Sequence, residues 1–494
     1  MQTLVQQADR RHTAHACRGP LGWQRAVDTG HDVGRPASSL ATTRDITFLI
    51  LSFEGPDRYS HAGGLGSRVD GLSRELAACG YETHLFFIGD PHLEGHEIVD
   101  GGKPGAGRLH LHRWCQWISH YHPGGVYDGE EGKLRDWNRS LPPWLLGEIV
   151  APRLASGGRV VIMAEEWQTA EVLVTLHQEL CRRGWGERVH LLWNANNIFG
   201  FERIPWEGLK QAATITTVSR YMKHVMWRHG VDARAIPNGI LDRWLCPVDG
   251  AARRRLARLL SGRLVLLKVA RFDPDKRWAM AVDAVGLLKE RGYRPLFLAR
   301  GGVENHGHEV LARARERGLA LADVHWEGSD IGGLEAALHR SLAADLLVLR
   351  GYLSEAQRRV LYRIADGVLA NSGIEPFGLV GLEAMACGGI AYVGCTGEDY
   401  VTPGHDAIAL QTDDPWEILY HTVRLHSRPE RALELRRAAR RSAMRYTWRA
   451  VIERILVPFV SELAAHGGGL EVVEAFGPSA VGAPHPLEAS AAAG

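Results

Sequence analysis

The sequence predicts an α/β protein with two doubly wound parallel sheets, because short apolar runs alternate with helical segments in both halves of the chain. In the first half, the run Ile46–Leu51 precedes a helix that ends at Gly80, and a second run follows at 83–88. Further runs of this kind lie at 159–163, 189–193 and 214–218, and a similar series begins at Leu264. Strands that alternate with helices are typical of right-handed βαβ units. We therefore expect two Rossmann-like domains that face each other across a cleft, with ligand loops at the carboxyl ends of the strands.

Composition and periodicity give the expected domain boundaries. Both ends of the chain lack a periodic apolar pattern, and the C-terminal end is rich in Gly, Ala and Pro, so we expect both to be poorly ordered. The expected segments are a disordered extension over 1–44, a first domain over 45–240, a linker over 241–261, a second domain over 262–445, a helix over 446–466 and a disordered tail over 467–494.

A pair of carboxylates marks the expected donor site in the second half. Glu375 follows a short apolar run that we predict to be a strand, and a small-residue helix begins near Phe377 or Gly378. The first amide groups of that helix, at Gly378 and Leu379, lack intrahelical partners and favour an anion. Glu383 lies about one turn inside, among apolar neighbours, where ribose hydroxyls would satisfy its carboxylate. A helix with two surface glutamates is the alternative.

A basic loop follows another predicted strand in the same half. Arg271, Lys276 and Arg277 lie within seven residues, and Pro274 favours a turn between them. Such cations can converge on a diphosphate that one helix end cannot neutralise alone. On its own, a loop of this kind is more often solvated surface.

Together, these two segments resemble the C-terminal half of the retaining nucleotide-sugar glycosyltransferases of the GT-B fold, family 4-like or group 1. Glycogen and starch synthases, sucrose synthases and bacterial mannosyl- and glucosyltransferases belong to that large family. The resemblance extends from about residue 45 to about residue 463. It implies that Arg271 and Lys276 hold the diphosphate, Glu375 lies beside the donor sugar, Glu383 binds the ribose, and the loop with Thr396 and Gly397 also contacts the diphosphate. It further implies that the last helix crosses back to the first domain.

A glycine-rich loop lies between the first strand and the first helix. Gly64 and Gly66 let the backbone approach a phosphate, and the helix N-terminus adds partial positive charge, so both are expected to bind the donor. The loop resembles the Lys-Thr-Gly-Gly-Leu-Gly loop of glycogen and starch synthases, with His61 in place of the lysine. We place His61 on the acceptor side, and its lack of a fixed charge puts the synthases' donor preference in doubt.

Two further segments depart from the synthases. The segment 164–169 resembles their His-Asp-Trp-Gln-type segment but has Glu165 at the position of the active-site histidine. Downstream, Asn-Ala-Asn-Asn around Asn196 replaces a Thr-Ile-His-Asn pattern. Either Glu165 or Glu166 binds acceptor hydroxyls or an amine, or both only cap a helix that begins near residue 167. The sequence leaves both interpretations open.

The composition of the chain limits the binding partners and the cellular compartment that we expect. With a formal net charge of +1, the chain of 494 residues has no global attraction to nucleic acid. No stretch approaches the roughly 18 consecutive apolar residues of a membrane span, so we expect none. Seven scattered cysteines without paired spacing indicate a reducing compartment, and we expect a cytoplasmic enzyme.

We expect no required metal or other cofactor. Asp273-Pro274-Asp275 matches the Asp-x-Asp metal signature of the other major glycosyltransferase fold, but the adjacent cations supply the charge that magnesium would. The loop histidines lack the spacing of a helical metal pair. They are His120, His122, His306 and His308.

The predicted reaction is retaining transfer of a hexose from a nucleotide diphosphate sugar. Arg271, Lys276 and the helix-end amides would stabilise the departing diphosphate, which takes the acceptor's proton, while Glu375 lies near the oxocarbenium-like sugar. The sequence does not identify the base, the sugar or the acceptor, which is a saccharide, a lipid or a small molecule. The alternatives are glucan extension of the glycogen or starch synthase type, a GT-B epimerase or hydrolase, and a non-catalytic sugar-nucleotide sensor.

Overall fold

The two predicted sheets are confirmed. A computed structural model describes residues 45–100 and 107–465, which fall in one compact unit, and the two expected disordered ends lie outside the described residues. The first sheet has the strand order β3-β4-β2-β1-β5-β6-β7-β8, and the second has the order β11-β12-β10-β9-β13-β14-β15. Adjacent strands are parallel, except that β3 runs antiparallel to β4.

The first sheet and its helices come from the first half of the chain. The strands are β1 (Ile46–Leu51), β2 (Glu82–Ile88), β3 (His96–Asp100), β4 (Arg108–Trp114), β5 (Arg159–Glu165), β6 (Val189–Ala195), β7 (Thr214–Thr217) and β8 (Arg234–Ala235). The helices are α1 (Gly64–Ala78), α2 (Gln116–Ser119), α3 (Glu130–Trp144), η2 (Leu145–Val150), α4 (Ala151–Ala155), η3 (Trp167–Thr169), α5 (Ala170–Arg183), η4 (Phe201–Arg203), α6 (Trp206–Ala212), α7 (Arg220–Met226) and η5 (Trp227–His229).

The second sheet follows the same plan. Its strands are β9 (Leu264–Val269), β10 (Pro295–Arg300), β11 (Leu321–Val324), β12 (Leu346–Leu349), β13 (Gly367–Ala370), β14 (Ala391–Val393) and β15 (Ile408–Ala409). Its helices are η6 (Asp242–Leu245), α8 (Gly250–Leu259), η7 (Pro274–Lys276), α9 (Trp278–Glu290), α10 (His306–Glu316), α11 (Ile331–Arg340), α12 (Glu355–Ile364), α13 (Leu379–Ala386), α14 (Pro415–His426), α15 (Pro429–Ala443) and η8 (Met444–Tyr446). The chain ends in α16 (Trp448–Val451), η9 (Ile452–Leu456) and α17 (Val457–Ala465).

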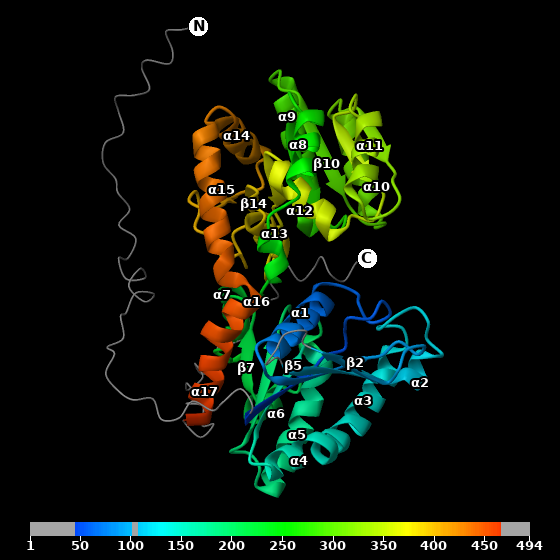
Figure 1. The fold of residues 1–494 in the computed structure, drawn as a ribbon, viewed down its shortest axis with the longest axis vertical. Helices are drawn as coiled ribbons and strands as arrows, with labels where there is room; N and C mark the ends of the chain where they lie inside the picture. Colours follow the sequence, from blue (N-terminus) through cyan, green and yellow to red (C-terminus); the bar gives the residue numbers. More distant parts are fainter. Residues whose placement is uncertain (1–44, 101–106, 466–494) are drawn as a thin grey trace, which may run out of the picture. The chain divides into compact units, whose positions relative to one another are not determined.

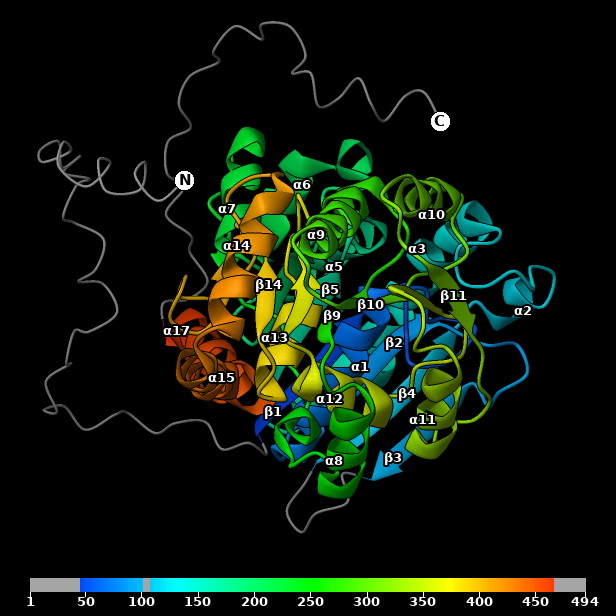
Figure 2. The ribbon, with the colours of Figure 1, turned by 90° about the horizontal axis from the view of Figure 1, so that it is seen from above.

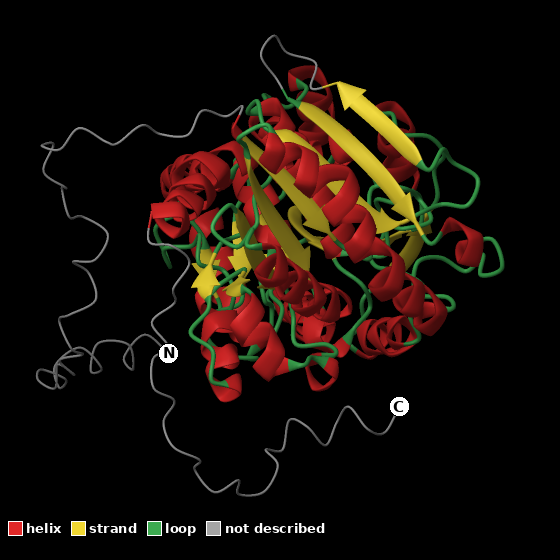
Figure 3. Cartoon of the chain, turned by 90° about the horizontal axis from the view of Figure 1, so that it is seen from below, coloured by secondary structure: helices red, strands yellow, loops and turns green. Residues whose placement is uncertain are grey.

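Helices cover both faces of each sheet, as a doubly wound fold requires. Figure 3 shows helices on both sides of the first sheet. Helix α1 and the last helical segments pack on one face of this sheet, and α3, η2 and α5 pack on the other. On the second sheet, α9 and α14 lie on the opposite face from α12 and α13 (Figure 2). The strands are almost continuously apolar because both faces are buried.

The segment 241–261, which was expected to be a linker, contains secondary structure. It holds η6 and α8, and α8 packs against α11 and α12 of the second half. Asp249 caps α8, since its carboxylate accepts hydrogen bonds from the amides of Ala251 and Ala252.

The chain crosses back to the first half through Trp448. Its amide donates to the carbonyl of Ile240 at 2.9 Å, and Ile240 forms a bridge with Thr447. From there α16, η9 and α17 run along the first sheet, next to β7 (Figure 1). A Cβ at Gly71 would lie 2.3 Å from Trp448 Nε1, and one at Gly239 would lie 2.7 Å from the Trp448 backbone. The buried indole therefore fits only between glycines.

Replacement of Trp448 tests this crossing. The side chain is 2% exposed, so Trp448→Ala leaves a large cavity and should lower the free energy of unfolding by about 3–5 kcal/mol. Trp416→Ala is the matched control, because that ring is 48% exposed and lies against Arg291. Urea denaturation followed by tryptophan fluorescence and circular dichroism measures both. Equal losses for the two variants would contradict a crossing held by Trp448.

Candidate functional site

A cavity of about 800 Å³ lies at the carboxyl ends of the central strands of both sheets. In each sheet the strand order reverses at one point, between β1 and β5 and between β9 and β13, and such points bind ligands in doubly wound folds. We call this cavity the donor pocket. From the first half it is lined by Glu54, Gly64, Leu65, Tyr127, Glu130, Glu166, Trp167, Gln168, Asn196, Asn197, Ile198, Phe199, Tyr221, Met222 and Asn238. From the second half it is lined by Arg271, Asp275, Lys276, Ile374, Glu375, Pro376, Phe377 and Leu379.

The structure brings together the three predicted catalytic residues. Lys276 Nζ lies 2.7 Å from Glu375 Oε2, and both side chains are about one-fifth exposed. Arg271 lines the same pocket from the loop after β9 and is exposed. The amide of Gly373 donates to the carbonyl of Asp275 at 2.7 Å, which ties the two loops together.

Arg277, the third cation of the basic loop, stabilises the loop and does not face the pocket. Its φ of 49° is in the left-handed region, which is uncommon for a residue with a side chain. Its Nε atom pairs with Asp413 at 2.6 Å, and it does not line the donor pocket. Two cations of the loop therefore face the pocket, rather than three.

The loop of Thr396 and Gly397 supports the backbone at Glu375. Thr396 Oγ1 accepts a hydrogen bond from the Glu375 amide at 2.9 Å and donates one to the Glu375 carbonyl at 3.1 Å. A Cβ at Gly397 would lie 2.1 Å from that carbonyl oxygen, so only glycine fits. Neither Thr396 nor Gly397 lines the pocket, so their loop holds the Glu375 backbone from the side that faces away from the pocket.

Helix α13 begins at Leu379, one or two residues later than expected. Gly378 is its N-cap and has no side chain that could cap the helix, so the first amides remain available to an anion. Leu379 lines the donor pocket. The carbonyl of Gly378 accepts a hydrogen bond from the hydroxyl of Tyr400, which fixes the start of the helix.

Glu383 lies one turn inside α13 and outside the donor pocket. Arg358 Nη1 lies 3.3 Å from its Oε2, and burial raises the pKa of this carboxyl to about 7 although Arg358 opposes the shift. The carboxyl is only 14% exposed. Arg358 holds it where a ribose hydroxyl was expected.

The glycine-rich loop is occupied by a carboxylate of the chain itself. Glu54 Oε2 accepts hydrogen bonds from the amides of Ala62, Gly63 and Gly66, at 3.2, 2.9 and 3.0 Å. Gly66 is buried and does not line the pocket, whereas Gly64 does. Of the two glycines that were expected to approach a phosphate, Gly66 thus donates its amide to Glu54, whereas no such bond to Glu54 forms from Gly64.

Glu165 is fully buried and is part of a hydrogen-bond network. Its Oε2 accepts from Arg68 Nε at 3.0 Å, from Asn194 Nδ2 at 2.9 Å and from Asn196 Nδ2 at 2.8 Å. It neither lines the pocket nor caps a helix. The capping interpretation of Glu165 is therefore wrong. Its carboxylate is bound by Arg68, a buried partner that sequence spacing does not reveal.

Glu166 faces the donor pocket with a strained backbone. Its φ and ψ of 69° and 170° belong to a region that is essentially restricted to glycine and costs about 1–3 kcal/mol. Its Oε1 accepts from the amide of Asn196 at 2.8 Å, and no side-chain cap forms on η3, so the capping interpretation is wrong for Glu166 as well. Burial raises the pKa of this carboxyl to about 8. Such strain is typical of functional sites.

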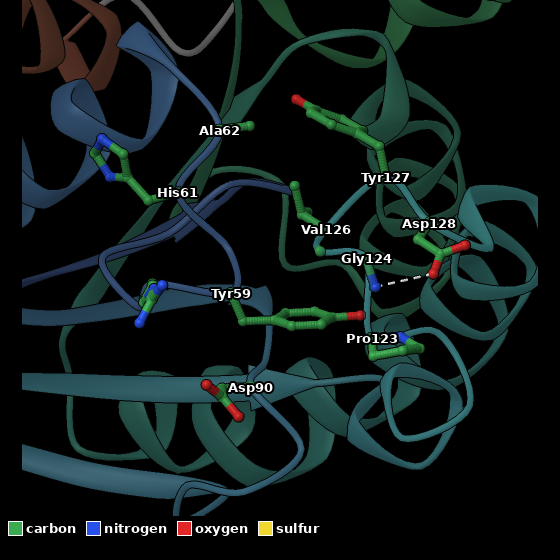
Figure 4. Close-up of a pocket in the computed structure, with 11 residues that line it drawn as sticks. Tyr59, His61, Ala62, Asp90, Pro123, Gly124, Val126, Tyr127 and Asp128 are labelled. Carbon is green, nitrogen blue, oxygen red and sulfur yellow. Dashed lines mark hydrogen bonds between the residues drawn. The ribbon is translucent and has the colours of Figure 1, made fainter. Parts of the chain in front are cut away.

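His61 lies in a second cavity, of about 530 Å³, which also has Tyr127 in its wall. In Figure 4, Tyr127 and Asp128 lie on one side of this cavity, and the His61 ring on the other side points away from them. His61 is exposed, and its Nε2 lies 3.3 Å from Ser67 Oγ. The two cavities meet at Tyr127, whose hydroxyl donates to Glu54 Oε1 at 2.8 Å.

Sequence reasoning missed several buried polar residues at the site. Glu54 follows β1 in the way that Glu375 follows β13, which is a usable signal. Lys268 lies inside an apolar strand and is fully buried, and its Nζ bonds the carbonyl of Leu369 and Oδ1 of Asn371. A charge within an apolar run was also visible in the sequence. Tyr127, by contrast, lies in an irregular segment without a periodic pattern.

No helix within 45–100 and 107–465 has the length and apolar character needed to cross a bilayer. The six cysteines in these ranges form no disulfide.

The chain is similar to curated glycosyltransferases over most of its length. The phosphatidylinositol dimannoside mannosyltransferase of Mycobacterium tuberculosis, described as GDP-mannose-dependent and α-(1-6), is 36% identical over 419 residues. The match covers 82% of this chain and 94% of that protein. The D-inositol 3-phosphate glycosyltransferase of Thermobispora bispora is 28% identical over 427 residues, which cover 81% of this chain and 90% of that protein.

Solved structures agree on the fold. Sucrose-phosphate synthase from Thermosynechococcus elongatus aligns with a TM-score of 0.60 at 18% identity, covering 85% of this chain and 100% of that chain. The catalytic domain of starch synthase IV from Arabidopsis thaliana, bound to ADP and acarbose, aligns with a TM-score of 0.59 at 16% identity, covering 85% and 99%. The family model described as "Glycosyl transferases group 1" matches residues 254–442. The chain therefore belongs to the group 1 glycosyltransferases and has the GT-B fold.

Proposed function

We propose that this protein is a retaining hexosyltransferase that needs no metal ion at the donor and that glycosylates a hydroxyl of an acceptor without a phosphate at the reacting end. The observation that carries the proposal is the Lys276–Glu375 pair, 2.7 Å apart, beside Arg271 and the N-terminus of α13. These groups combine positive charge for a diphosphate with one carboxylate for the sugar.

The charges match the expected course of the reaction. Cleavage of the bond between the anomeric carbon and the phosphate leaves negative charge on the diphosphate and positive charge on the sugar. Arg271, Lys276 and the first amides of α13 stabilise the former. Glu375 stabilises the latter and holds sugar hydroxyls. The acceptor oxygen attacks the anomeric carbon from the face that the diphosphate leaves. The new C–O bond to the acceptor forms as the C–O bond to the phosphate breaks, and the proton of the acceptor hydroxyl passes to the departing phosphate.

The donor is proposed by analogy. The Mycobacterium tuberculosis relative is described as GDP-mannose-dependent, and GDP-mannose is therefore the first donor to test. A panel of GDP-, UDP- and ADP-sugars belongs in the same assay.

The acceptor side of the pocket has carboxyl groups but no cation among the described residues. Glu54, Glu130 and Glu166 line it from the first half, without any Lys or Arg of the ranges 45–100 and 107–240. Burial raises the pKa of Glu166 to about 8, so this carboxyl is neutral near pH 7 and the repulsion of an anion rests on Glu54 and Glu130. Asn196 Oδ1 is buried and has no partner among the described residues, so it can accept from a ligand hydroxyl. A phosphate would be repelled here, whereas sugar hydroxyls or an amine would be bound.

The Lys276–Glu375 pair is tested by Lys276→Ala. Loss of one group that stabilises transition-state charge should lower kcat by about 100- to 1,000-fold. Nucleoside diphosphate release with the preferred donor and acceptor measures the effect. Lys289→Ala is the matched control, because Lys289 lies in the same half, pairs with Asp345 and is absent from the donor pocket. A rate for Lys276→Ala within threefold of the control would refute the assignment, and inversion at the anomeric carbon, seen by NMR of the product, would refute retention.

Independence from a metal ion at the donor is tested directly. Initial rates should change by less than about twofold on addition of Mg²⁺ or Mn²⁺, because two cations already neutralise the diphosphate. A strict requirement for either ion would contradict the proposal and indicate that Asp273 and Asp275 act as ligands.

The protonation of Glu166 gives a prediction about pH. Burial favours the neutral carboxyl and raises its pKa from an ordinary 4.5 to about 8, so its favourable contribution is complete below pH 4.5 and is lost as the pH rises towards 8. Glu166→Gln removes the ionisation and keeps the shape. The variant should melt close to wild type at pH 5 and several degrees higher at pH 9.

Differential scanning calorimetry across pH 5–9 measures this difference. Glu202→Gln is the control, since Glu202 is exposed and its replacement should leave the pH dependence unchanged. Parallel curves for wild type and Glu166→Gln would show that Glu166 is ionised throughout.

A further inference from the structure

Four histidines gather on one face of the first sheet, away from the donor pocket. His84 lies on β2, His110 and His112 lie on β4, and His96 lies on the edge strand β3. In the strand register His84 is opposite His110, and His96 is opposite His112. Residues opposite each other share a face, and so do residues two apart on one strand, so all four imidazoles are on the same side.

Three of these side chains are arranged as a set of metal ligands. One ring nitrogen from each of His84, His110 and His112 can be chosen so that all three lie within 4.8 Å of one another. His84 Nδ1 and His112 Nε2 are 3.0 Å apart. Two nitrogens bound to one tetrahedral zinc ion at the usual bond length are about 3.3 Å apart. A small inward or outward shift of rings on rigid strands would therefore complete the site.

A carboxylate orients one of the rings. His110 Nε2 lies 2.7 Å from Glu82 Oε1, an arrangement in which the ring donates through Nε2 and keeps the lone pair on Nδ1. Metal-binding histidines commonly donate their other nitrogen to a carboxylate in this way, which fixes the tautomer and raises the basicity of the ligand. His110 Nδ1 lies 3.1 Å from Nε2 of His96, the exposed member of the cluster.

Two of the rings are buried among aromatic side chains. His84 is 9% exposed and His112 is 7% exposed. His112 stacks on Phe86 with ring centroids 4.2 Å apart and meets Trp144 edge-on at 5.4 Å. Neutral imidazole is the form that binds metal ions. The ring nitrogens that face one another now share hydrogen bonds, His84 with His112 and His110 with His96, and one cation would replace both ring-to-ring contacts at once.

We propose that His84, His110 and His112 bind one zinc-like divalent cation, with exposed His96 or water at the fourth position. Three neutral imidazoles suit Zn²⁺ and, with different geometry, Cu²⁺ or Ni²⁺. The site joins the antiparallel edge strand to the interior of the sheet, and none of its ligands lines the donor pocket. Its role is therefore structural, and it is independent of the metal-free chemistry proposed at the donor.

The test uses the whole chain, freed of metal with a chelator and dialysed. Zinc titration by calorimetry should show one tight equivalent, the bound metal should be confirmed by elemental analysis, and the melting temperature should rise with zinc. Cobalt should give the visible bands of a tetrahedral nitrogen site. His112→Asn and His110→Asn should lose the tight zinc equivalent, the visible cobalt bands and the rise in melting temperature with zinc. His405→Asn, at an exposed histidine outside the cluster, should keep all three.

The outcomes separate metal binding from simple ring packing. If His112→Asn fails to fold, the less buried His110→Asn and the cobalt spectrum of the wild type still decide the question. Weak zinc binding at several equivalents, equal in wild type and His110→Asn, would overturn the proposal, as would a wild type without tetrahedral cobalt bands. In either case the histidines would be a hydrogen-bonded stack of neutral rings.

Discussion

The buried guanidinium of Arg68 connects the parts of the molecule that form the site. Its side chain is 1% exposed, its Nε pairs with Glu165 at the end of β5, and its Nη1 donates to Asn238 Oδ1 at 2.5 Å. The same guanidinium lies 5.6 Å from the centroid of the Trp448 ring, where the chain crosses back. A buried charge without partners is costly, so α1, β5 and the crossing segment are held in the one arrangement that pairs it. The position of Glu166 follows, because it is the next residue along the chain.

The two halves of the site differ in where they carry cations. Arg271 and Lys276 line the pocket from the second half, next to the carboxylates of Asp275 and Glu375, whereas the described residues of the first half contribute carboxyl groups and no Lys or Arg to the lining. Burial raises the pKa of one of these carboxyl groups, that of Glu166, to about 8, which favours its neutral form. Under the proposed function, a diphosphate would therefore find its counter-charges at the second half alone.

Features that depend on local order along the chain were predictable, and features that depend on partners distant in sequence were not. The apolar runs predicted the strands, because parallel strands that are buried on both faces consist almost entirely of apolar residues. The charged loops after β9 and β13 were also predictable, since their charged residues directly follow the apolar runs in the sequence. Glu165 could not be assigned, because its environment comes from Arg68, 97 residues away. Glu383 likewise faces Arg358 of another helix. The histidine cluster was missed although β4 carries His110 and His112 at alternate positions, since their partners on β2 and β3 become neighbours only through the strand register.

The carboxylate of Glu54 has a consequence for the working cycle. By accepting three loop amides, it ties the glycine-rich loop down with hydrogen bonds from within the chain. A loop that is already ordered loses little conformational entropy when substrates arrive, so binding energy is not consumed in shaping it. Under the proposed function, the first half would present a pre-organised surface to the acceptor, and adjustment would fall to the second half, where the diphosphate and the sugar would compete with the contact between Lys276 and Glu375.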